Sequence, residues 1–146
     1  FEDEARRVAA WAAGDAEGGW ERGNELEREM IATVVSSENK CFYCVVAHGA
    51  GVRELSGDPV LGELMAINYR AAEISPRQRA MLDFAVKMTR APAEVEEADR
   101  QALRNLGFDE RDILDIANIA AFFNMTNRVS TALDRMPNRE YHSKAR

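Results

Sequence analysis

Residues 29 to 48 constrain the fold of this chain more than any other stretch. Their first half, Met30 to Val35, is apolar nearly all round a helix apart from Thr33, so we expect a buried helix over residues 25 to 37. Their second half holds both cysteines and one of the two histidines of the chain. The reactive side chains therefore follow, in the sequence, directly after a helix that we expect to be buried.

Cys41, Cys44 and His48 are spaced for one face of a helix. If Asn39 caps a helix that begins at Lys40, these three side chains lie at i, i+3 and i+7. The free N–H groups at a helix start lower the pKa of a nearby thiol from about 8.5 toward neutrality. The imidazole one turn after Cys44 can take its proton and hold the thiolate as an ion pair. The spacing therefore favours a redox-active thiol pair.

Other uses of the pair stay open at this point. A disulfide between Cys41 and Cys44 would close a very short loop and add little stability. A zinc site would need Glu29 beside His48 and the two thiols, and this ligand set is unusual for structural zinc. Inert packing of buried thiols is the third interpretation. We predict redox-active thiols, with no metal and no cofactor.

A family pattern runs through the same stretch. Glu29, eleven residues, C-x-x-C, three residues and His48 together resemble the alkylhydroperoxidase D (AhpD)-like and carboxymuconolactone decarboxylase superfamily. Its branch of uncharacterised peroxidase-related proteins is similar to three downstream segments, namely LDFAVKMTRAP, LRNLGFDERDI and FFNMTNR. The resemblance covers roughly residues 26 to 136.

The resemblance also changes the interpretation of Glu29. The helical pattern places this residue on a small polar strip, where a solvated carboxylate near a helix start is the simplest assignment. The family resemblance implies instead that Glu29 faces Cys44 and His48 and that the proton relay serves the second cysteine. The helix-start argument favours Cys41 as the first nucleophile, so the order of attack stays open.

The fold class follows from the absence of strand patterns. No segment shows the period-2 alternation of a strand, so we predict an all-α fold, an AhpD-like multihelical bundle of six or seven helices. Residues 1–25 are expected to form an extension, a helix over 2–13 and a loop over 14–24, before a helical domain over 26–146. Further helices are expected over residues 60–72, from 76 to before Pro92, and over 95–106 and 110–133.

Composition and charge limit the classes of molecule that this chain is expected to bind. The net charge of −6 and 25 acidic residues, with no basic stripe, argue against nucleic acid. The uncharged runs are too short for a membrane span. No secretory signal is visible and no disulfide framework exists, so we expect the cytoplasm. Helices that are apolar round more than half their circumference indicate self-association, and the resemblance implies a homo-oligomer, a trimer or higher.

These observations predict a thiol-dependent peroxidase or disulfide oxidoreductase. Cys41 and Cys44 would cycle between dithiol and disulfide, with His48 and Glu29 as the relay, on a peroxide or a small disulfide. A lipoyl or thiol protein would be the reductant. The first rival is a cofactor-free lyase of the carboxymuconolactone decarboxylase type, whose members generally lack the cysteine pair. The second is a binding protein with a vestigial site.

Overall fold

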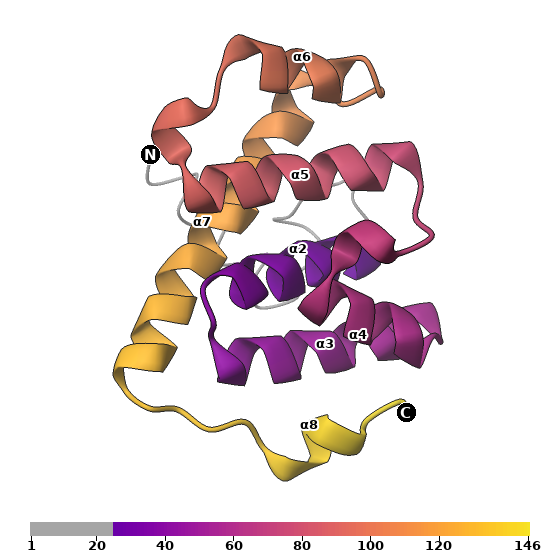
Figure 1. Ribbon diagram of the computed structural model, residues 1–146, viewed down its shortest axis with the longest axis vertical. Helices are drawn as coiled ribbons and strands as arrows, with labels where there is room; N and C mark the ends of the chain where they lie inside the picture. The colour runs from indigo at the N-terminus through magenta and orange to yellow at the C-terminus, as the bar shows by residue number, and fades with distance from the viewer. Residues whose placement is uncertain (1–24) are drawn as a thin grey trace.

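The computed structural model describes residues 25–146, and the predicted N-terminal helix and loop lie outside them. The described chain forms seven α-helices, two short 3-10 helices and no strand, which confirms the predicted all-α class (Figure 1). The α-helices are α2 (Glu25–Glu38), α3 (Phe42–Ser56), α4 (Pro59–Ile67), α5 (Pro76–Arg90), α6 (Glu97–Arg104), α7 (Glu110–Ala132) and α8 (Arg139–Ser143). The 3-10 helices are η1 (Tyr69–Ala71) and η2 (Pro92–Glu94).

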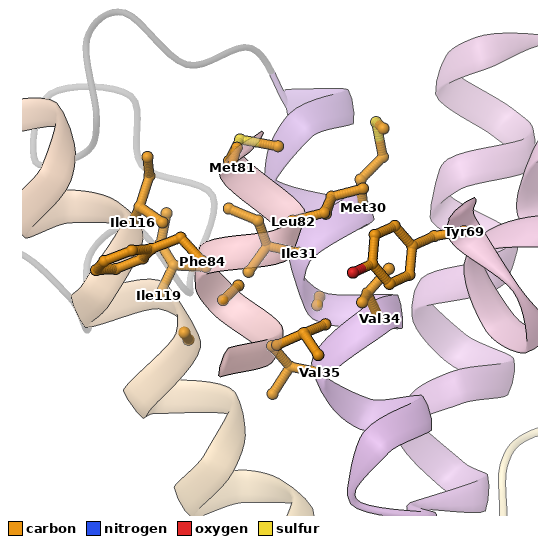
Figure 2. Close-up of a cluster of buried hydrophobic side chains, with 14 of the residues drawn as sticks. Met30, Ile31, Val34, Val35, Tyr69, Met81, Leu82, Phe84, Ile116 and Ile119 are labelled. Carbon is orange, nitrogen blue, oxygen red and sulfur yellow. The ribbon is translucent and has the colours of Figure 1, made fainter. Parts of the chain in front are cut away.

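Helix α2 forms the centre of the fold. It packs against α3, α4, α5 and α7, and Figure 1 shows it between α5 on one side and α3 with α4 on the other. Its residues 30–36 are all buried, which confirms the predicted buried helix. Figure 2 shows Ile31 and Val35 of α2 in the same buried cluster as Phe84 of α5. Burying each side chain of this kind stabilises the fold by roughly 1.5–3 kcal/mol.

The turn between α2 and α3 corrects the predicted helix start. Helix α3 begins at Phe42 with Cys41 as its N-cap, whereas the prediction was a start at Lys40 capped by Asn39. Lys40 takes a left-handed conformation with φ 56°, and Cys41 N–H donates to the Ser36 carbonyl oxygen at 3.0 Å. This is a Schellman motif, in which backbone N–H groups satisfy the last carbonyl oxygens of α2. Lys40 and Cys41 therefore belong to the end of α2, and α3 begins only after them.

A second correction concerns the predicted helix over residues 60–72. Helix α4 ends at Ile67, and Asn68 leaves the helical region at φ −156° before the short η1. The change of direction buries the ring of Tyr69, whose hydroxyl donates to Asp83 Oδ1 at 2.6 Å. Burial of one aromatic ring and its bond to α5 therefore outweighs continuation of the helix.

The predicted starts of the two long later helices, at residues 76 and 110, are confirmed. Ser75 and Gln78 form a capping box at the start of α5, with Pro76 in the first turn. Asp109 forms the equivalent box at the start of α7 with Asp112. Helix α6 is shorter than the predicted 95–106, because Glu96 is its extended N-cap and Asn105 its C-cap.

The end of the chain packs against α3. Arg53 of α3 is only 4% exposed and donates from Nε to the Lys144 carbonyl and from a terminal nitrogen to the Tyr141 carbonyl, at 2.9 and 2.8 Å. These bonds hold α8, an element that the sequence did not predict, beneath α3 (Figure 1). Among the described residues, no helix combines the length and apolar character that crossing a membrane requires.

Candidate active site

A pocket of about 450 Å³ lies where α2, α3 and α7 meet. It contains three of the four predicted site residues, Glu29, Cys44 and His48. Apolar walls come from Leu55, Phe122 and Phe123, and the remaining lining residues are polar or charged, namely Glu25, Arg28, Tyr43, Thr126, Ser130 and Arg135. The pocket therefore combines reactive groups with room for a small organic molecule.

Glu29 points toward His48. Its Oε2 lies 2.8 Å from His48 Nδ1. The Glu29 side chain is 30% exposed and the His48 side chain 26%. The approach depends on Gly51, because a Cβ atom there would lie only 2.6 Å from Glu29 Oε2. The structure therefore places the Glu29 carboxylate against the His48 imidazole, and its part in a proton relay stays a prediction.

The contacts of His48 define the roles of its ring nitrogens. An ionised carboxylate only accepts hydrogen bonds, so the Nδ1–H donates to Glu29 and Nε2 is left to accept a proton. The imidazole also packs edge-on against Phe123 of α7, with ring centroids 4.7 Å apart and planes at 75°. The carboxylate and the aromatic ring together hold the imidazole in one orientation.

The Cys44 thiol is buried and protonated. Its pKa is raised to about 11, chiefly by burial and also by a hydrogen bond with Cys41, while hydrogen bonds with Asn127 and Ser130 act in the opposite direction. At neutral pH the group is therefore a neutral thiol. Among the described residues, no direct hydrogen bond joins Cys44 to His48, so the predicted thiolate–imidazolium pair is absent from this reduced state.

Cys41 is buried and lies beside a different pocket from the one that contains Cys44. Both cysteines are free thiols, exposed by only 1% for Cys41 and 4% for Cys44. Cys41 lines a second, smaller pocket of about 160 Å³, together with Phe42, Met136 and others, in which neither His48 nor Glu29 takes part. Cys41 raises the pKa of Cys44 through a hydrogen bond and through its charge, so the two thiols influence each other's ionisation.

The described part of the chain offers no arrangement of three or more His, Cys, Asp or Glu side chains that could hold a metal ion. The four predicted site residues thus form a thiol pair and a separate carboxylate–imidazole pair. Such an arrangement can move a proton and form a disulfide.

The comparisons with known proteins show the family of this chain. An uncharacterized peroxidase-related protein from Silicibacter sp. TM1040 is 60% identical, with a TM-score of 0.90 over 97% of this chain and 73% of that one. An uncharacterized peroxidase-related protein from Ralstonia eutropha JMP134, described as an alkylhydroperoxidase AhpD core, is 43% identical, with a TM-score of 0.88 over 99% of this chain and 76% of that one. The chain belongs to the AhpD-like family.

More distant structures share the AhpD-like fold. A putative antioxidant defence protein AhpD from Agrobacterium tumefaciens is 18% identical, with a TM-score of 0.72 over 94% of this chain and 90% of that one. The debrominase Bmp8 in its apo form is 19% identical, with a TM-score of 0.71 over 84% of this chain and 66% of that one. No family model and no curated protein matches the chain.

The sequence did not single out two residues that lower the pKa of Cys44 in this AhpD-like chain, Asn127 and Ser130 of α7. They lie one helical turn apart and are 1% and 7% exposed. Their sequence signal was two polar side chains that follow the apolar positions Ile116, Ile119, Ala120 and Phe123 on the inner face of α7. A buried amide there requires a polar partner, but periodicity alone does not say which one.

Proposed function

We propose that this protein is a thiol-dependent peroxidase that reduces an organic hydroperoxide with its C-x-x-C pair. The observation that carries the proposal is the shared pocket of Cys44, His48 and Glu29, with a second free thiol hydrogen-bonded to the first. Its apolar walls, Leu55, Phe122 and Phe123, favour an alkyl hydroperoxide over hydrogen peroxide. The peroxidase-related relatives support the same reaction class.

The first step in this proposal is attack by Cys44. Because its pKa is raised to about 11, the thiol needs a base at neutral pH, and the Nε2 of His48 takes the proton through a water molecule in the pocket. The Cys44 thiolate attacks the terminal peroxide oxygen and the O–O bond breaks. The sulfur becomes a sulfenic acid, and the departing alkoxide takes a proton and leaves as an alcohol.

Closure of the cycle uses the neighbouring thiol. Cys41 attacks the Cys44 sulfenic acid, so that a disulfide forms and water leaves. Two thiols of a reductant, of the lipoyl or protein-dithiol class, then return two electrons and two protons. Glu29 acts through the imidazole, because it holds the Nδ1–H and stabilises the positive charge that His48 carries after it takes the proton.

The lyase and vestigial-site alternatives fit the site less well. A cofactor-free lyase would have no use for two adjacent free thiols beside an oriented imidazole. A vestigial site would not require Gly51 to admit the Glu29 carboxylate to the face of α3. These features favour the peroxidase among the three.

One equivalent of an alkyl hydroperoxide tests the proposal. We expect both free thiols to disappear and the peptide that contains Cys41 and Cys44 to lose the mass of two hydrogens, because the sulfenic acid is resolved within the pair. Thiol titration and peptide mass spectrometry give the result, and treatment with a small dithiol should reverse it. Unchanged thiols, or a sulfenic acid that persists at one position while the other stays a free thiol, would contradict the proposed cycle.

We also propose that the chain forms a homo-oligomer through the outer face of α7. Three apolar side chains spaced at i, i+4 and i+8 are exposed there, Met125 by 56%, Val129 by 48% and Leu133 by 62%. Sedimentation velocity should show a trimer or higher for the wild type and smaller species for Val129→Glu, because a charge would be buried in the contact. Ile67→Glu on α4 is the control. A monomeric wild type, or equal effects of both variants, would overturn this proposal.

A further inference from the structure

The turn between α2 and α3 decides where Cys41 lies relative to Cys44. Cys41 is the N-cap of α3, with an extended backbone at φ −82° and ψ 98°, and its carbonyl oxygen accepts from Val45 N–H at 2.9 Å. Cys44 is the third residue of that helix. An N-cap side chain turns back toward the second and third residues of its helix. This position therefore directs the Cys41 side chain toward Cys44.

The local sequence favours a different position for Cys41. A helix that begins at Lys40 and is capped by Asn39 would place both cysteines inside the helix, three residues apart. Cβ atoms with this spacing are about 5–6 Å apart within a helix, whereas a disulfide requires about 3.5–4.5 Å. The two thiols would then form a disulfide only after the backbone had moved. The observed start of α3 therefore favours the disulfide, and the alternative start opposes it.

The Asn39 side chain is bound to α7 and does not cap a helix. Its Nδ2 donates to Asn124 Oδ1 and to Asn127 Oδ1, each at 3.0 Å. A helix that began at Lys40 would instead need the Asn39 side-chain oxygen beside the N–H groups of its first turn. The two amides of α7 thus hold the side chain that would otherwise start α3 two residues earlier.

Two further bonds fix the turn. Asn127 Nδ2 donates to Ser36 Oγ at 2.8 Å, and the Ser36 carbonyl oxygen accepts from Cys41 N–H at 3.0 Å. Asn127 and Ser36 are both buried, at 1% and 0% exposed. Lys40, which lies between Ser36 and Cys41, has a left-handed conformation with φ 56°, and this is unfavourable for a long side chain. Such a conformation persists only where the surrounding contacts impose it.

We infer that Asn127 is a positioning residue for Cys41, and that it acts through Asn39 and Ser36 to set how readily the disulfide with Cys44 forms. Its oxygen holds one part of the turn and its nitrogen holds the other. A thiol that is held near its partner reacts as if at a high local concentration. The inference rests on the proposed disulfide chemistry, but it concerns the stability of the disulfide and not the peroxide.

The test is the equilibrium of the full chain with glutathione at pH 6, where an ordinary thiol is protonated. One oxidised glutathione takes two electrons and two protons from the two thiols, which gives one protein disulfide and two reduced glutathiones. Asn39→Asp is the first variant, because aspartate is an equally good helix cap but has no donor for the two α7 oxygens. It should favour the reduced pair by about tenfold in the equilibrium constant, or about 30 mV.

Asn105→Asp is the matched control. It makes the same change of shape and charge at the C-cap of α6, where the Asn105 side-chain oxygen accepts from Gln101 Nε2 at 2.9 Å and can still do so after the change. Its disulfide should keep the wild-type equilibrium. Asn127→Leu introduces no charge and should shift the equilibrium in the same direction as Asn39→Asp. Equal equilibria in the Asn39 and Asn105 variants would overturn the inference.

A second measurement follows the turn without any redox reaction. Because Cys41 N–H donates to the carbonyl oxygen of the buried Ser36, it should exchange slowly with solvent in the wild type and about tenfold faster in Asn39→Asp. Asn105→Asp should leave this exchange unchanged. Unaltered protection of the Cys41 N–H in Asn39→Asp would overturn the inference. A wild type that forms the disulfide with glutathione but does not consume hydroperoxide would contradict only the proposed peroxidase.

Discussion

Replacing Cys44 with serine should lower the rate of hydroperoxide reduction by about 10³-fold or more, to near the rate without protein. Loss of a covalent nucleophile removes the reacting bond itself, and changes of this kind have the largest effects in enzymes. The measurement is steady-state consumption of an alkyl hydroperoxide with a small dithiol as reductant. A Cys44→Ser variant with near wild-type turnover would exclude Cys44 as the nucleophile.

The matched variant is Cys41→Ser, and its expected behaviour differs in kind. It should consume about one equivalent of hydroperoxide quickly and then slow, because Cys44 forms a sulfenic acid that has no partner thiol. A dimedone-type trap should label Cys44 in this variant. The opposite pattern, with a burst in Cys44→Ser and none in Cys41→Ser, would assign the first attack to Cys41.

Glu29→Gln should lower turnover by about 10²-fold or more while the fold is preserved. The amide can still accept from the His48 Nδ1–H, but it carries no charge to stabilise the imidazolium that forms when His48 takes the thiol proton. Turnover and thermal unfolding should be measured together. Glu25→Gln is the control, because Glu25 lines the same pocket and precedes Glu29 by one helical turn. Equal turnover in the two variants would remove Glu29 from the relay.

A pair of glycine variants tests the same interaction without changing Glu29. Gly51→Ala places a methyl group 2.6 Å from Glu29 Oε2 and should displace the carboxylate from His48, with a loss of turnover in the same direction. Gly49→Ala, on the same helix, meets no atom nearer than 3.8 Å and should keep its activity. Both changes add helix propensity of about 1 kcal/mol, so a difference in activity between them reports the carboxylate.

The sequence by itself determined the helical class and several helix boundaries. The capping boxes that begin at Ser75 and Asp109 each join two residues three positions apart. Because both partners are close in the sequence, such a helix start can be predicted without knowledge of the tertiary structure. The buried character of α2 was also visible, because residues 30–35 leave little polar surface on any side. The C-x-x-C pair with His48 and Glu29, together with three downstream segments, carried the AhpD-like resemblance, which the comparisons confirm.

Only the tertiary structure decided how the site is assembled. The Schellman turn at Lys40 made Cys41 an N-cap, and the burial of Tyr69 ended α4 early, since contacts with other elements outweighed local preference. Glu29 lies on the polar strip of its helix, and only the packing of α2 against Gly51 of α3 brings it to His48. Asn127 and Ser36 are 91 positions apart. Periodicity describes one helix at a time, so it does not predict which buried side chain of another helix will hold the turn before Cys41.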